Sequence, residues 1–166
     1  MSHTQTAAQP TTSESISKFT ERACICITAL TPLILISAPA ISAQLGSEMG
    51  LSASQIGTFF FVEKGAYSLG AIPPLLLLSR IKPKTIALIS LLICILGNIV
   101  CSLNTGDYTS TLMCRAIAAA AAGSLNVLCM MTAAKAINPE RLFSHCIMGQ
   151  LVLGAAALWV LPQIFA

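Results

Sequence analysis

Five apolar runs dominate this sequence, and each is close to the roughly 20 residues that a helix needs to cross a bilayer. They cover residues 23–43, 55–78, 85–103, 110–134 and 143–165. The runs do not alternate apolar with polar residues as barrel strands do, and only helices satisfy their own backbone groups in lipid. We therefore predict an all-α, polytopic transmembrane helix bundle of about five spans within residues 21–166.

The composition agrees with a lipid environment. Of 166 residues, 55% are hydrophobic and only 9% are charged, and the mean hydropathy is +0.82, whereas a soluble domain carries about 25% charged residues. No basic cluster with interleaved aromatics occurs, which argues against a nucleic-acid partner. No H-E-x-x-H, paired-carboxylate or Ser-plus-His pattern lies at membrane depth, and the seven cysteines form no C-x-x-C pair. We expect no enzyme, catalytic residue, cofactor or metal site.

The first 20 residues are rich in Ser and Thr and contain almost nothing apolar. Such a segment cannot bury enough surface to offset its ordering entropy, so we predict a disordered tail. A signal peptide is the alternative, since Lys18 and Arg22 precede an apolar run and residues 38–40 have a small-x-small form. The basic end lies far from Met1, and no soluble domain follows. We therefore interpret residues 23–43 as a retained span.

Basic residues orient the bundle. The tail and the second-to-third and fourth-to-fifth loops hold seven of them: Lys18, Arg22, Arg80, Lys82, Lys84, Lys135 and Arg141. The other two loops contain no basic residue, and their only charged residues are Glu48 and Asp107. By the positive-inside rule, we expect a cytoplasmic N-terminus, in a plasma membrane or a bacterial inner membrane.

Three ionisable residues fall inside spans: Glu63, Lys64 and Arg115. Each would cost about 2.5–3.5 kcal/mol at the bilayer centre if it faced lipid. At a rise of 1.5 Å per residue, Glu63 lies about 13 Å and Arg115 about 9 Å from the outer end of its own span. Because the two depths are similar, we predict that the two side chains pair. Lys64 would then be available to a ligand.

Polar residues near these charges extend the candidate site. Tyr67 shares a helical face with Glu63, and Asn126 lines up with Arg115. We take Glu63, Lys64, Arg115, Tyr67 and Asn126 as candidates for substrate binding or proton coupling. The alternative is a structural ion-pair network that touches no substrate. Asn98, in the third span, is predicted to make an interhelical hydrogen bond.

Several motifs resemble those of the N-terminal half of a major facilitator superfamily (MFS) transporter. Residues 51–57, Leu-Ser-Ala-Ser-Gln-Ile-Gly, are similar to the start of the family's second helix. The short loop Ser79-Arg80-Ile81-Lys82-Pro83-Lys84 occupies the place of its G-x-x-x-D-R-x-G-R-K motif. Arg80 and Lys84 match that motif, and Ser79 stands at its acidic position. Arg115 followed by the small residues Ala119, Ala121 and Gly123 is similar to the family's R-x-x-x-G-x-G pattern, whose two glycines fall at Ala119 and Ala121.

The resemblance implies a six-helix half that works with a second half around a shared substrate site, and Arg80 and Lys84 as gating-loop residues. The sequence then represents a partial or truncated secondary transporter for a small-molecule solute, paired with a second half or acting as a homo-oligomer. Because Lys64 and Arg115 are two bases and Glu63 is the only acid inside the spans, we expect the solute to be an organic anion. The alternative is a small integral membrane protein with an interaction or assembly role and no transport of its own.

Overall fold

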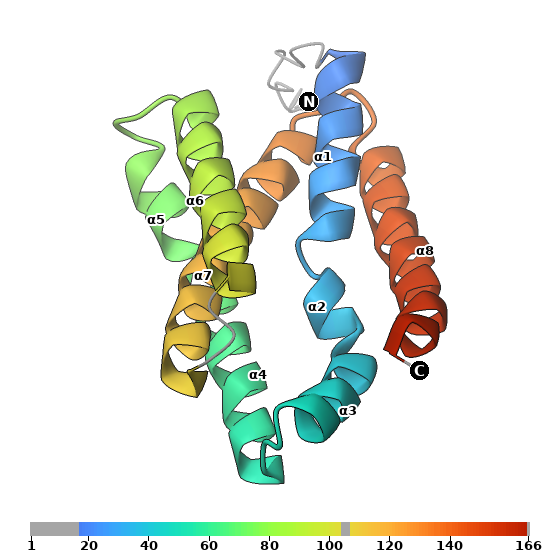
Figure 1. The fold of residues 1–166 in the computed structure, drawn as a ribbon. Helices are drawn as coiled ribbons and strands as arrows, with labels where there is room; N and C mark the ends of the chain where they lie inside the picture. The colour runs from blue at the N-terminus through green and yellow to red at the C-terminus, as the bar shows by residue number, and fades with distance from the viewer. Residues whose placement is uncertain (1–16, 104–106, 166) are drawn as a thin grey trace, which may run out of the picture.

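The computed structural model describes residues 17–103 and 107–165, and in these ranges every regular element is a helix (Figure 1). The eight helices are α1 (Lys18–Leu30), α2 (Leu33–Ile36), α3 (Ala38–Glu48), α4 (Ala53–Leu69), α5 (Ile72–Leu77), α6 (Pro83–Leu103), α7 (Tyr108–Ala133) and α8 (Pro139–Phe165). The expected tail at residues 1–16 lies outside the described residues.

The predicted tail is too long by three residues, because α1 already begins at Lys18. The Ser17 hydroxyl accepts a hydrogen bond from the Phe19 N–H at 3.3 Å and caps this end. Serine is among the preferred N-cap residues because its oxygen satisfies a backbone donor that the first helical turn leaves free. The helix therefore starts before the apolar run does.

The first predicted span is not one continuous helix but three pieces, α1, α2 and α3. The first break falls at Pro32, which has no N–H to donate to the carbonyl of Thr28. Gln150 of α8 reaches across and donates its side-chain N–H to that carbonyl at 3.0 Å. A neighbouring helix thus satisfies the carbonyl that the proline leaves free.

The second predicted span is also broken, between α4 and α5 at Gly70 and Ala71. Here Pro74 cannot donate to the Gly70 carbonyl, and the Ser124 hydroxyl of α7 donates to it instead at 2.5 Å. At its other end α4 has a capping box between Ser52 and Gln55. The expected single helix over 55–78 is therefore wrong at its centre, although its outer ends lie within two residues of the structure.

Four stretches are long and apolar enough to cross a membrane by length and composition: 18–36, 83–103, 108–133 and 139–164. They correspond to the first, third, fourth and fifth predicted spans, with boundaries shifted by a few residues. Many large apolar side chains, such as Leu92 and Leu151, are more than half exposed. An outward apolar surface on long helices is that of an α-helical integral membrane protein.

Helix α7 forms the centre of the bundle. In its most apolar stretch 56% of the residues are buried, whereas at most 17% are buried in each of the other three stretches that could cross a membrane. Helix α7 packs against α1, α4 and α6. Small residues allow this. A Cβ on Gly123 would overlap the Tyr67 carbonyl of α4, and a Cβ on Gly70 would overlap the Ala120 carbonyl of α7. Backbones that approach so closely need glycine at the crossing.

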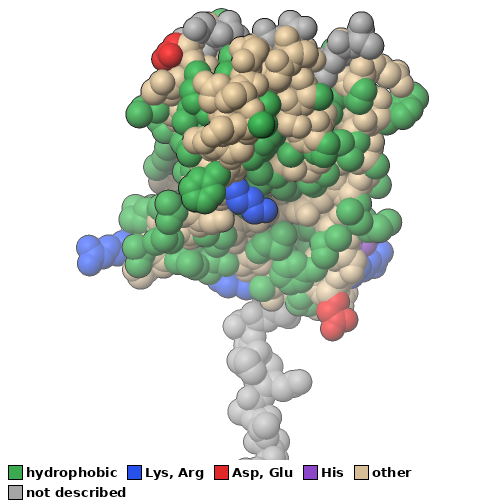
Figure 2. Space-filling view, turned by 90° about the horizontal axis from the view of Figure 1, so that it is seen from below, with side chains coloured by type: hydrophobic (Ala, Val, Ile, Leu, Met, Phe, Trp, Pro, Cys, Tyr) green, Lys and Arg blue, Asp and Glu red, His purple; other side chains and the backbone are tan. Residues whose placement is uncertain are grey.

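The basic segments gather at one end of the bundle. The start of α1, the α5–α6 connection and the α7–α8 connection lie together at the top of Figure 1. The α3–α4 turn, the start of α7 and the end of α8 lie at the opposite end. Seen from that second end, hydrophobic side chains cover much of the surface (Figure 2). This arrangement agrees with the alternation of loops that the positive-inside rule predicts.

Candidate functional site

The predicted pair of Glu63 and Arg115 is confirmed. The Arg115 Nη2 atom donates to Glu63 Oε1 at 2.5 Å, and the side chains are 10% and 4% exposed, respectively. Glu63 lies on α4 and Arg115 on α7, so the ion pair bridges the two helices that cross at Gly70 and Gly123. Two charges buried at membrane depth stay ionised at an acceptable cost only when they neutralise each other.

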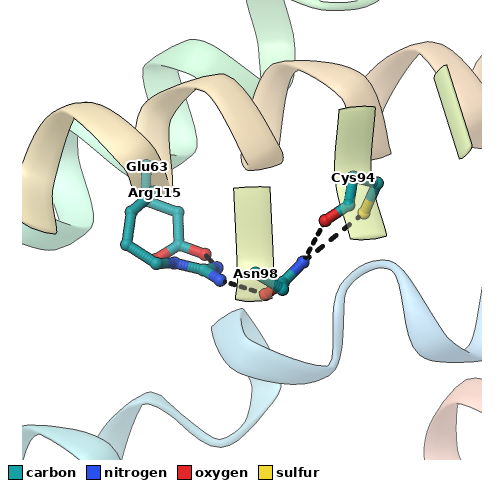
Figure 3. A network of polar contacts seen from close by, with 4 residues as sticks. All are labelled: Glu63, Cys94, Asn98 and Arg115. Carbon is teal, nitrogen blue, oxygen red and sulfur yellow. Dashed lines mark hydrogen bonds and ion pairs between the residues drawn. The ribbon is translucent and has the colours of Figure 1, made fainter. Parts of the chain in front are cut away.

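A third helix joins the pair, as the stick view shows (Figure 3). Arg115 Nη1 donates to Asn98 Oδ1 of α6 at 2.7 Å, which confirms the interhelical bond expected of Asn98. The Asn98 amide in turn donates to the Cys94 carbonyl, also at 2.7 Å. The guanidinium is thus held from two sides, and the network ties α4, α6 and α7 together.

The network still has unused hydrogen-bonding capacity. Glu63 Oε2 and Arg115 Nε are both buried and have no hydrogen-bond partner within the described part of the chain. An unpaired carboxylate oxygen can accept a proton or a donor from a ligand, and the Nε–H can donate to an anion. The pair therefore keeps one acceptor and one donor that no described residue uses.

Lys64 lies apart from this network. Although it follows Glu63 directly, it is exposed, because successive helical residues point about 100° apart. Within the described ranges no ion pair reaches it. Gly57 and Gly65 on the same helix also face open space, with nothing within 4 Å of an added Cβ. The structure separates the three predicted charges into a buried pair and one free ammonium group.

Tyr67 and Asn126 form a second polar cluster with Thr31, a residue that the sequence interpretation missed. The Tyr67 hydroxyl of α4 lies beside the side chains of Thr31 and Asn126. Nevertheless, no residue in the described ranges is a hydrogen-bond partner of the Thr31 hydroxyl or of the Asn126 side-chain carbonyl oxygen. Ser37, at the next break in the same span, is 1% exposed, and its hydroxyl also has no partner among residues 17–103 and 107–165. The polar residues beside Pro32 in the sequence could have indicated that Thr31 belongs to this cluster.

Arg80 and Lys84 are exposed at the connection between α5 and α6. This connection lies at the basic end of the bundle, whereas Arg115 lies in the half of α7 nearer the other end (Figure 1). The structure therefore does not bring the loop residues next to the Glu63–Arg115 pair. Their gating role stays a prediction.

The cysteines are free thiols, and Cys24, Cys129 and Cys146 are buried. Among residues 17–103 and 107–165, no group of three His, Cys, Asp or Glu side chains could hold a metal ion. The chemistry that the described site offers is ion pairing and hydrogen bonding.

Comparison with known proteins identifies no relative. No protein family matches the sequence, no curated protein is similar to it, and no solved structure matches its fold.

Proposed function

We propose that this chain is part of a secondary transporter for a small solute. In this proposal it forms a five-crossing half, similar to the N-terminal half of an MFS transporter, and works with a second half or a second copy. Its N-terminus is cytoplasmic, and α4 with α5 makes the second crossing. Glu63, Lys64, Arg115, Tyr67 and Asn126 line or support the solute path.

One observation carries the proposal, namely the free ammonium group of Lys64. It lies 11 residues beyond the start of α4, or about 16 Å along a crossing through a hydrocarbon core of roughly 30 Å. A lysine that faced lipid there would cost about 2.5–3.5 kcal/mol. Its surroundings must therefore be water or protein, which is what a transport path between two halves provides.

The two broken spans support the same function. Transporters commonly build their solute sites where membrane helices are interrupted, because breaks expose polar groups near the midplane. Here the break after α1 places Thr31 beside Tyr67 and Asn126, and the break after α4 lies one turn beyond Tyr67. Lys64, on the same helix as Tyr67, has no ion-pair partner among the described residues. A free cation on this crossing favours an anionic solute, such as an organic acid.

The test is uptake into membrane vesicles from native cells in which the gene is deleted and then restored. We expect deletion to abolish uptake of at least one solute from a panel of organic anions, cations and neutral compounds. The wild-type chain and Lys64→Arg should restore uptake, and Lys64→Gln should not. Uptake that is unaffected by deletion for every solute would refute the transport proposal.

A role in assembly is the second candidate, since Gly57 and Gly65 would also let a partner helix approach closely. A cysteine in place of the exposed Ser68, one turn beyond Lys64, distinguishes the transport function from the assembly function. We expect Ser68→Cys to react with a charged, water-soluble thiol reagent, because a thiolate forms only in contact with water. Protection of this cysteine by a tightly packed partner helix would favour assembly.

A further inference from the structure

A groove of about 360 Å³ runs between α5, α6 and α7, on the outside of the bundle. Its sides are apolar. Leu77 of α5 and Ile81 of the following loop lie at one end, and Ile86, Ile89 and Ile93 of α6 form one wall. These three residues are spaced three or four apart, so they lie on one face of α6 for about 10 Å.

The groove results from the break in the second span. The backbone contact between Gly70 and Ala120 holds the end of α4 tightly against α7. After the break, α5 continues as a separate short helix beside α6 (Figure 1). The space between α5 and α6 is floored by Ala120, Ala121 and Ser124 of α7. These three side chains are small, and Ile117 is the one large α7 side chain that also lines the groove.

Positive charge is concentrated at one end of this groove. Ile81 lines it and lies between Arg80 and Lys82, and Lys84 precedes Ile86 by two residues. These three basic residues are exposed, and no ion pair reaches them in the described ranges. The sequence contains no acidic residue between Glu63 and Asp107. The N-terminus of α6 adds a partial positive charge at the same place.

We propose that the groove binds one acyl chain of an anionic phospholipid whose phosphate contacts Arg80, Lys82 and Lys84. The apolar walls select a lipid over a free phosphate ion, because a soluble anion gains nothing from them. The three cations select an anionic headgroup over a zwitterionic one, as basic sites between membrane helices do. The lipid holds α5 against α6 and α7.

The experiment is native mass spectrometry of the full chain released from a mixture of phosphatidylglycerol and phosphatidylcholine. We expect one phosphatidylglycerol to be retained in preference to phosphatidylcholine. The double variant Arg80→Gln/Lys84→Gln should lower that retention by roughly tenfold or more. The matched control is Lys135→Gln/Arg141→Gln, which removes the same charge at the same end but away from the groove, beside a pocket lined by Asn138, Pro139, Glu140 and Arg141. It should leave retention unchanged.

A third variant tests the acyl-chain part of the proposal. Ile89→Trp adds bulk to the groove wall at a side chain that is 52% exposed, so it should fold normally. We expect it to reduce retention of phosphatidylglycerol without any change of charge. The proposal is overturned if Ile89→Trp retains the lipid fully, or if the two double variants lose it equally. Equally strong competition by glycerophosphoglycerol, which has no acyl chains, would also overturn it.

Discussion

The crossing of α4 and α7 predicts opposite effects for two glycine-to-alanine substitutions. A Cβ on Gly123 would overlap the Tyr67 carbonyl, whereas a Cβ on Gly57 meets nothing within 4 Å. Both glycines lie inside helices, and neither has a positive φ. The two substitutions therefore differ in what surrounds the new methyl group and not in backbone strain.

The expected loss of stability in Gly123→Ala follows from the contacts where α4 and α7 cross. Relief of the overlap in Gly123→Ala requires α7 to move from α4 by about 1 Å or more, and such overpacking costs about 1–3 kcal/mol. The same movement stretches the bond from Ser124 to the Gly70 carbonyl, which leaves a buried acceptor unpaired at about 1–3 kcal/mol. We expect a total loss of about 2–6 kcal/mol. Gly57→Ala should instead gain up to about 1 kcal/mol from helix propensity.

The buried thiols supply the assay. Heating the purified chain with a fluorogenic thiol reagent reports when Cys24, Cys129 and Cys146, at most 6% exposed, become accessible. At about 2–4 °C per kcal/mol, Gly123→Ala should unfold roughly 4–24 °C below the wild type, and Gly57→Ala slightly above it. Gly70→Ala should behave like Gly123→Ala. Equal midpoints for Gly123→Ala and Gly57→Ala would refute the close backbone crossing.

Two further predictions use the same assay. Arg115→Leu should destabilise the chain by about 3–5 kcal/mol because it leaves the Glu63 carboxylate buried without its partner. The double variant Glu63→Leu/Arg115→Leu should recover much of that loss, and a double variant as unstable as the sum of both single variants would contradict a coupled pair. Ser124→Ala and Gln150→Leu should each cost about 1–3 kcal/mol, because each strands a carbonyl that a proline has left free. The controls Ser102→Ala and Gln163→Leu, at exposed positions, should change stability by less than about 0.5 kcal/mol.

The sequence predicted what depends on length and spacing along a helix. Run lengths located the apolar helices, and the rise per residue placed Glu63 and Arg115 at similar depth. Glu63 is the only acidic residue inside a predicted span, so Arg115 had a single acidic partner to find there. The polar character of Asn98 in an otherwise apolar run was enough to predict an interhelical bond. Each of these inferences needs only the position of a residue along its own helix, without knowledge of how the helices are rotated.

Rotation and interruption of the helices could not be predicted in the same way. Which way Lys64 faces depends on how α4 is turned against α7, and that turn is set by the contact between Gly123 and Tyr67. The break at Pro32 and the break at Gly70–Ala71, before Pro74, depend on whether another helix supplies a donor. Neither Gln150 nor Ser124 carries a local signal of that role. A run long enough to cross the bilayer therefore indicates a helix but not a continuous one.

Two of the three breaks, those beside Pro32 and before Pro74, share a chemistry that identifies them as fixed parts of the fold. In each, a proline removes the donor for the carbonyl four residues earlier, and a side chain of a neighbouring helix replaces it, Gln150 for Thr28 and Ser124 for Gly70. A free carbonyl in an apolar interior is costly, so these bonds hold the bent geometry in place. Flexible hinges would tolerate Ser124→Ala and Gln150→Leu without loss of stability. Fixed bends would not, and the cost expected for those two variants therefore follows from this chemistry.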